Sequence, residues 1–241
     1  MRNAFLLAGR ELAAYLRSPL GYIVVSVLLL IDGLLFYVRA LGSGARLSAD
    51  VLQEFFNNTS GVTMILAIAL SFRLIAGERE HGTLVLLNTA PIQDREIVAG
   101  KFLSALGFLA AAMAITVYMP LLIFVNGKVS TGHILVGYLG IMLLGSASLA
   151  IGLFASAVSK SQVIAVVIGA AIVGVMLVLW LAARVTDPPL NTLLSSLALH
   201  HERQKSFMTG VLKLENVVFY LAVTYFFLLA ATKTLEARRW R

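Results

Sequence analysis

Long apolar runs alternate with short polar segments along most of the chain. A helix that crosses a bilayer needs about 20 mostly apolar residues to cover ~30 Å of hydrocarbon. Six runs meet this requirement: 20–39, 59–77, 102–126, 132–157, 162–184 and 216–234. Turn-forming residues at 126–132 and 159–161 separate the third, fourth and fifth runs. The pattern predicts an all-α polytopic membrane protein with six transmembrane helices, and without an internal repeat we treat 1–241 as a single transmembrane domain.

Residues 1–18 have the periodicity of an amphipathic helix. Apolar and basic positions fall on opposite faces at about 100° per residue: Phe5, Leu12 and Leu16 against Arg10 and Arg17. Leu7 departs from this pattern, and Pro19 ends the helix before the first span. We predict an interfacial helix here. Its role is either to anchor the topology of the chain or to contact a separate subunit that supplies energy.

The longest polar interruption on the opposite side is the loop at about 185–215. Asp187, Pro188 and Pro189 open it, and leucines follow at helical spacing: Leu190, Leu193, Leu194 and Leu197. This spacing predicts a short amphipathic helix that lies on the membrane surface or caps the bundle. About thirty residues are too few for a substrate-binding domain.

The segment between the second and third spans, about 78–98, is charged and bounded by turn signals. Thr83 follows Gly82 as a candidate N-cap, and Pro91 ends the short helix that begins there. Leu84, Leu86 and Leu87 form an apolar ridge on that helix, and Asp94 can cap the run that leads into the third span. We predict a short helix parallel to the membrane that can receive a push from outside, the alternative being an ordinary amphipathic loop.

Composition supports a membrane protein. The chain is 59% hydrophobic and 13% charged, and it contains no cysteine, which excludes disulfides and Cys-ligated metals. The net charge of +7 comes from basic residues beside the apolar runs, so it favours anionic lipid over nucleic acid. If both termini share one side, that side holds twelve of the nineteen Lys and Arg residues, which predicts cytoplasmic termini and a cytoplasmic 78–98 segment.

Catalytic and cofactor motifs are missing from the sequence. It has no GxxxxGK[ST] phosphate loop, no HExxH and no GxSxG. His200 and His201 are adjacent rather than four apart, so we expect solvated loop histidines there, and the same for His81 and His133. We therefore expect no catalytic residue, no bound cofactor and no metal in this chain.

Asp32 is the one acidic residue well inside a predicted span. Its carboxylate either faces a polar cavity or forms a buried hydrogen bond, and the sequence does not distinguish these two alternatives. Arg73, near the end of the second span, can reach the interface with its long side chain. A single carboxylate is poor support for a proton relay, which favours an energy source outside the chain.

Small residues recur every four positions in the fourth and fifth spans. The series are Ser148, Gly152 and Ser156, then Ala165 and Gly169, then Ala170 and Gly174. Such spacing allows helix backbones to approach closely inside a membrane. It predicts tight helix contacts without identifying a dimer face.

Three segments together resemble a known family. EREHGTLVLLNTAP, followed by IVAGK, resembles the first cytoplasmic loop of type-2 ABC exporter permeases. RELAAYLRSPLGY is similar to their amphipathic N-terminal helix and first span. HHERQKSFMTGVLKLENVVFYL and the closing LEARRW resemble the gliding-motility (GldF-like) and nitrous-oxide-accessory branch.

The resemblance implies a permease of the bacterial inner membrane with a cytoplasmic coupling helix. Two separate ATP-binding subunits would bind ATP and Mg²⁺, and a second permease copy, identical or related, would complete the assembly. The positions that match the coupling region are Glu78, Glu80, Gly82, Thr83, Leu84 and Pro91, to which we add Leu87 of the apolar ridge. A partner with a large periplasmic domain accompanies some members of this branch.

Two functions of different classes follow. The first is a transmembrane permease subunit that couples ATP hydrolysis by its partner to export or to mechanical work. The alternative is a membrane scaffold that anchors a periplasmic or motility complex without transport. An intramembrane enzyme is disfavoured by the lack of a catalytic constellation, and the sequence does not choose among lipid, polysaccharide, peptide and purely mechanical work.

Overall fold

The computed structural model of the chain describes residues 2–41, 47–83 and 92–239, and these residues are helical apart from short connections. The first half contains α1 (Arg2–Arg17), α2 (Pro19–Leu35), the π-helical turn η1 (Phe36–Leu41), α3 (Ser48–Ser71) and α4 (Ala76–Glu80). The second half contains α6 (Asp94–Thr116), α7 (Tyr118–Asn126), α8 (Thr131–Val158), α9 (Gln162–Arg184), α10 (Leu190–Leu197), α11 (His201–Met208) and α12 (Leu214–Arg239).

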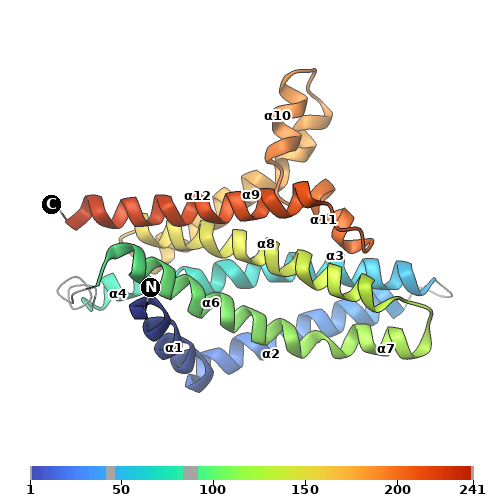
Figure 1. Cartoon of the computed structure of the whole chain (residues 1–241), viewed down its shortest axis with the longest axis horizontal. Coiled ribbons are helices and arrows are strands. Elements are labelled where there is room, and N and C mark those ends of the chain that lie inside the picture. The colour runs from blue at the N-terminus through green and yellow to red at the C-terminus, as the bar shows by residue number, and fades with distance from the viewer. Residues whose placement is uncertain (1, 42–46, 84–91, 240–241) are drawn as a thin grey trace.

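Six helical segments are long and apolar enough to cross a membrane, as the sequence predicts. They are Gly21–Arg39, Ser48–Glu80, Asp94–Val125, Thr131–Val158, Gln162–Arg184 and Leu214–Arg238. The long helices form a bundle in which α1, α4 and the end of α12 lie at one end (Figure 1). We call this the terminal end of the bundle, and the opposite end, where α3 and α8 begin, the distal end.

Two spans start earlier than hydropathy predicts. The second begins at Ser48 rather than 59, because polar residues such as Asp50 and Glu54 continue the helix beyond the apolar run. The third begins at Asp94 rather than 102 and is interrupted at Val117. Pro120 explains the interruption, since it has no N–H to donate to the carbonyl of Thr116 one turn earlier. Apolar runs thus locate the membrane-spanning part of a helix but not its full length.

The centre of the bundle is α8, which packs against α3, α6, α9 and α12. The predicted small-residue contacts form here: a Cβ on Gly152 would lie 1.8 Å from Ser71 Oγ of α3. Gly169 of α9 lies against Gly152 and Ala155 of α8, where a Cβ would make ordinary contacts at 3.5 Å. Gly174 has nothing within 4 Å, so its place in a four-residue series does not make a contact. The same four-residue spacing of small residues therefore forms a close helix contact at Gly152 but none at Gly174.

Helix α1 forms as predicted, but its packed face is different. Leu7, which departs from the sequence pattern, is buried, whereas Phe5 and Leu16 of the predicted apolar face are exposed. The buried side fits against α6, where a Cβ on Gly100 would lie 2.9 Å from the carbonyl oxygen of Ala4. The close approach of two backbones, rather than the strongest apolar stripe, decides which face is inside.

The distal loop contains the predicted α10 and a second helix, α11, that the leucine pattern does not predict. The prediction of solvated histidines is wrong for His200 and for His133. The His200 ring is mostly buried and lies 2.7 Å from Ser60 Oγ, and His133 Nε2 lies 2.6 Å from the Met208 carbonyl oxygen. The exposed ring of His201 stacks on Trp180 with 3.8 Å between the ring centroids. These contacts tie α11 to α3 and α8.

Candidate functional site

The charged segment after the second span begins as a short helix, α4, set off from α3 by a turn at 72–75. Ser156 of α8 holds this turn. Its hydroxyl donates to the Phe72 carbonyl at 2.7 Å and accepts from the backbone N–H groups of Ile75 and Ala76 at 3.1 and 2.8 Å. One serine thus replaces backbone hydrogen bonds that the turn interrupts, and it fixes α4 relative to α8.

Two charged residues of α4 hold the turn that joins α8 to α9. Arg79 donates to the carbonyl of Ser159 and, at 3.1 Å, to that of Ala157. Arg238 of α12 donates to the Val158 carbonyl between them. Cations are favoured at this position because the last carbonyls of a helix carry partial negative charge.

Glu80 accepts a 3.5 Å hydrogen bond from the backbone N–H of Gln162, at the start of α9.

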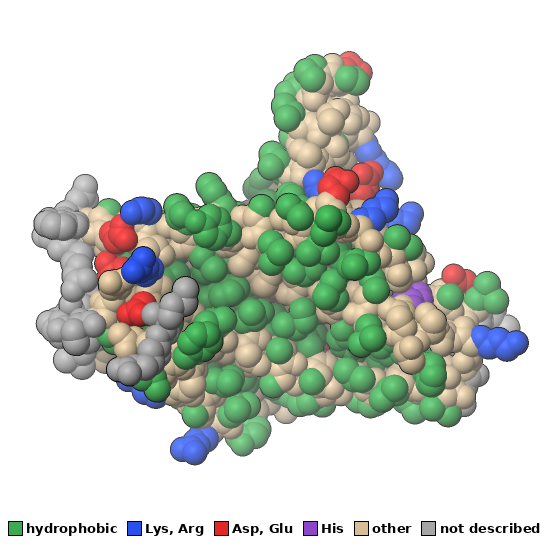
Figure 2. All heavy atoms as spheres, in the orientation of Figure 1, with side chains coloured by type: hydrophobic (Ala, Val, Ile, Leu, Met, Phe, Trp, Pro, Cys, Tyr) green, Lys and Arg blue, Asp and Glu red, His purple; other side chains and the backbone are tan. Residues whose placement is uncertain are grey.

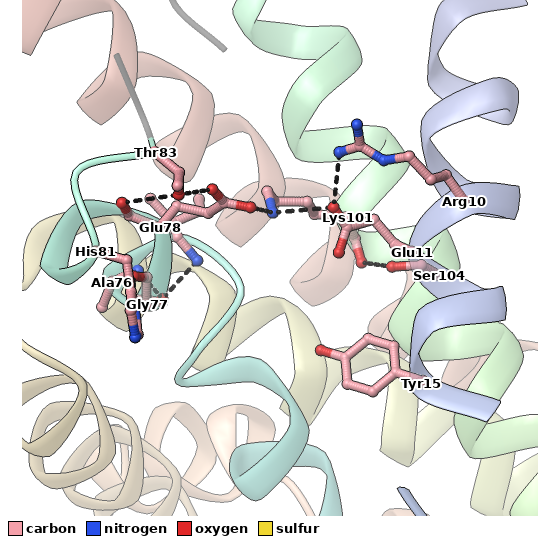
Figure 3. Close-up of polar contacts among 12 residues, drawn as sticks. Arg10, Glu11, Tyr15, Ala76, Gly77, Glu78, His81, Thr83, Lys101 and Ser104 are labelled. Carbon is pink, nitrogen blue, oxygen red and sulfur yellow. Dashed lines mark hydrogen bonds and ion pairs between the residues drawn. The ribbon is translucent and has the colours of Figure 1, made fainter. Parts of the chain in front are cut away.

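Glu78 points in the other direction, toward α6 and α1 (Figure 3). Lys101 Nζ of α6 lies 3.0 Å from Glu78 Oε1 and 3.6 Å from Glu11 Oε1 of α1. The lysine is only 1% exposed, whereas the two carboxylates keep some contact with the surface. A buried cation is stable only when it is paired, so the two acids hold α1 and α4 to the same point of α6. We call Glu11, Glu78 and Lys101 the ion triad.

A cavity of about 470 Å³ adjoins the ion triad at the terminal end. Its lining includes all three triad residues together with Tyr15, Arg73 and His81. Burial raises the pKa of the Tyr15 hydroxyl to about 12, so the group stays protonated and donates to the Leu70 carbonyl at 3.5 Å. The cavity therefore lies where α1, α4 and α6 meet.

The structure covers only the first part of the predicted coupling helix. Gly82 has a φ of +72°, the left-handed conformation that glycine adopts most readily, which fits its predicted role in the turn. The Thr83 hydroxyl donates back to the backbone carbonyl and the carboxylate of Glu78. The remaining predicted residues, Leu84, Leu86, Leu87 and Pro91, lie outside the described residues. Helix α6 begins at Asp94 itself, with Gln93 at the N-cap, so Asp94 is one residue later than a cap.

Asp32 of α2 is far from this site. It is 2% exposed and belongs to a buried stripe with Leu28 and Phe36. Its carboxylate faces Thr59 of α3, yet neither carboxylate oxygen has hydrogen-bond geometry to any described residue. The structure thus buries Asp32 beside Thr59, and the choice between a polar cavity and a buried hydrogen bond stays a prediction.

Sequence reasoning missed the residues that assemble the site. The sequence indicates Lys101 only as one of the basic residues beside a span. It indicates Arg79 only as one of the twelve Lys and Arg residues that predict cytoplasmic termini. A signal was present for Lys101, since an acid near the end of one span and a lysine near the start of the next lie at the same end of a helical pair. Nothing in the sequence marked Ser156 as different from the other small residues of α8.

The described residues contain no group of three His, Cys, Asp or Glu side chains that could hold a metal ion. The functional groups at the terminal end are instead ion pairs and capping contacts that connect α4 with α1, α6, α8 and α9. Such an arrangement can transmit a displacement of α4 to several spans at once.

Comparison with known proteins gives a family but no individual relative. Residues 6–236 match the family model described as ABC-2 family transporter protein. No curated protein matches the chain. The match includes every span and the whole 78–98 segment, and members of this family form the membrane component of ABC transporters, separate from the ATPase. The chain therefore belongs to the ABC-2 family of transporter proteins.

Proposed function

We propose that this chain is a permease subunit that couples ATP hydrolysis by separate nucleotide-binding subunits to export or mechanical work across the bacterial inner membrane. The observation that carries the proposal is the attachment of α4. Arg79 and Glu80 hold it to the α8–α9 turn, and Glu78 holds it to α6 and α1 through Lys101. A force applied just beyond Thr83 therefore acts on four helices through named contacts.

In this proposal the coupling region has two parts. Gly82, Thr83, Leu84, Leu87 and Pro91 form the surface that the ATPase contacts. Glu78, Arg79, Glu80 and Lys101 transmit the motion inward. Two ATPase subunits, which bind ATP and Mg²⁺, act on this permease and a second copy of it or a relative.

The proposed orientation places both termini and the coupling region in the cytoplasm. The distribution of Lys and Arg supports it, because twelve of nineteen belong to that side. The sequence resemblance of HHERQKSFMTGVLKLENVVFYL and LEARRW further supports the gliding-motility and nitrous-oxide-accessory branch of the family. In that branch a partner with a large periplasmic domain would bind at the distal end.

The test is to purify the permease with the ATPase encoded beside it, reconstitute the complex in nanodiscs, and measure ATP hydrolysis. Leu84→Asp and Glu80→Ala probe the coupling region, and Lys101→Met probes transmission. Arg95→Met is the matched control, since Arg95 is an exposed basic residue on the same helix as Lys101.

We expect Leu84→Asp to lose the ATPase from the complex. Lys101→Met should retain the ATPase, but its hydrolysis rate should fall toward that of the isolated ATPase. Arg95→Met should behave like the wild type. If no ATPase associates with the wild-type chain, the proposal is wrong and a membrane scaffold becomes the better account.

A further inference from the structure

One part of the molecule projects sideways from the bundle. It consists of the last residues of α9, from Leu177, and α10, which turns back to Leu197, and we call 177–197 the arm. Figure 1 shows the arm crossing the direction of the long helices at a steep angle, nearer the distal end than the terminal end. Helix α10 has no buried residue, so the arm does not cap the bundle.

The base of the arm is held at a defined height along the bundle. The backbone N–H of Leu199 donates to the Met176 carbonyl at 3.1 Å, and His200 lies 2.7 Å from Ser60 of α3. Tyr220 of α12 donates to the Leu199 carbonyl at 2.8 Å. Ser60 marks a change along α3: the part before it is rich in Asp, Glu, Asn and Gln, and the part after it is apolar. The arm therefore leaves the bundle at the level where α3 changes from polar to apolar.

The arm has two chemically different sides. Its large exposed apolar residues recur at helical spacing in both limbs: Val178, Leu181 and Val185, then Leu190, Leu193 and Leu197. The other side encloses a small hollow of about 190 Å³ lined by polar residues such as Arg184, Asn191, Ser195 and Glu202. In Figure 2, hydrophobic side chains gather on the side of the arm toward the terminal end, and basic side chains lie on the side toward the distal end.

The apolar side continues a surface that already faces lipid. Val163, Val167 and Val175 of α9 are exposed along the span, and the exposed residues of the arm prolong the same helix. Trp180 lies at the junction, with the Arg184 guanidinium 4.6 Å above its ring. Tryptophan and arginine side by side are typical of the membrane–water boundary, where an apolar ring meets a hydrated charge.

From this arrangement we propose that the arm lies flat in the headgroup layer at the distal face of the bilayer, with the leucines of α10 inserted among lipids and its polar side in water. An in-plane amphipathic helix gains the free energy of apolar burial without spanning the membrane. The arm thereby fixes the depth of α9, of whose apolar window only 17% is buried within the protein. This inference does not depend on the proposed function or on which face of the membrane is cytoplasmic.

The chain contains no cysteine, so single cysteines can be labelled without a background. We would attach an environment-sensitive fluorophore to Leu193→Cys on the apolar side and to Ser195→Cys on the polar side of the same helix. Val167→Cys in the span and Asp50→Cys at the start of α3 are the lipid and water references. Each variant is placed in nanodiscs of phosphatidylethanolamine and phosphatidylglycerol, with nitroxide lipids or iodide as quenchers.

We expect the label at 193 to be quenched several-fold more by headgroup nitroxides than by iodide, and the label at 195 to show the reverse. Quenching of 193 by iodide at the level of the Asp50→Cys reference would place the arm in water and overturn the proposal. Shielding of 193 from both quenchers, with cross-linking between two copies through that cysteine, would also overturn it and identify a second copy as the occupant. Both cysteine sites lie on a helix without buried residues, so neither variant threatens the fold.

Discussion

Helices α8 and α9 follow each other in the chain and are both apolar enough to span a membrane, but their surroundings differ. In α8, 67% of the most apolar window is buried within the protein, against 17% in α9. Helix α8 contacts helices on several sides, whereas α9 leaves the bundle near Met176 and continues into the arm. Hydropathy measures how well a helix tolerates lipid, and it says nothing about whether lipid or protein covers it.

The difference depends on small residues and hydrogen bonds at particular positions. A Cβ on Gly137 or Gly152 of α8 would clash with a side chain of α3, and a Cβ on Gly145 would clash with Leu109 of α6. Ser156 adds three hydrogen bonds to the turn that joins α3 to α4. In α9, only the half that begins at Gln162 makes comparable contacts. Substitutions at matched positions in the two helices should therefore have unequal effects.

The largest difference is expected between Gly152→Leu and Gly174→Leu. A side chain at 152 must displace Ser71, and we expect a loss of about 3 kcal/mol, the upper range for overpacked interiors. At 174 the space is open, and the change should stay within about 0.5 kcal/mol. Unfolding in nanodiscs by heat or by denaturing detergent measures both. If the two substitutions destabilise the protein equally, the distinction that the structure makes between the packed Gly152 and the open position of Gly174 is wrong.

The next comparison is Lys101→Met with Arg184→Met. Removing Lys101 takes the cation from Glu78 and leaves Glu11 paired only with the exposed Arg10, and we expect a loss of about 2–3 kcal/mol, less than for a fully buried pair because the acids reach water. Removing Arg184 breaks only an exposed contact with Trp180, worth less than about 1 kcal/mol. The same unfolding measurement applies. The further variant Glu78→Gln should share most of the Lys101→Met effect, and independent, additive effects of the two substitutions would contradict the triad.

A smaller contrast is expected between two serines. Ser156→Ala leaves the backbone N–H groups of Ile75 and Ala76 buried without a partner, for a loss of about 1–2 kcal/mol. Ser195→Ala on the arm removes only an exposed hydrogen bond to the Thr192 carbonyl and should change stability by less than about 0.5 kcal/mol. Hydrogen exchange adds a local measurement, because exchange at 75 and 76 should accelerate in Ser156→Ala. Unchanged exchange there would show that another group holds the turn.

The smallest effect concerns pH and the base of the arm. Burial, with the nearby charge of His201, lowers the pKa of His200 to about 4 in the folded protein. The unfolded chain, with a pKa near ~6.5, binds the proton more readily, so stability is full above that value and falls as pH drops toward 4. We expect about 1 kcal/mol between pH 7 and pH 5, reduced by the partial exposure of the ring. His200→Gln should flatten this dependence, and an unchanged pH profile in that variant would exclude His200 as its source.

Several features followed from the sequence because they depend on near neighbours. The six spans, the reversals at 126–132 and 159–161, the break at Pro19 and the helix at 190–197 all reflect hydropathy or turn residues within a few positions. The positive φ of Gly82 belongs to the same class, since glycine alone carries little steric cost there. Each of these features is determined by the hydropathy and the backbone preferences of residues that are close in the sequence.

Other features could not be predicted because their partners are distant in the chain. Glu78 and Lys101 are 23 residues apart, and Ser60 and His200 are 140 apart. The buried side of α1 was misjudged for the same reason, since Gly100 of α6 selects it. In the candidate site, the sequence marked Glu78 and Glu80 as residues of the coupling region, but their partners in the fold, Lys101 and Gln162, are 23 and 82 residues away in the chain.

The sequence by itself determined that this protein is a six-span helical membrane protein with a charged segment after the second span. Apolar runs of sufficient length must enter lipid and satisfy their backbone as helices, whatever they later contact. Only the tertiary structure decided which helix became the core, which face of α1 packs, where Lys101 finds its acids, and that the arm leaves the bundle. Lipid is as apolar as leucine, so hydrophobicity does not order helices within a membrane, and close packing and paired polar groups do.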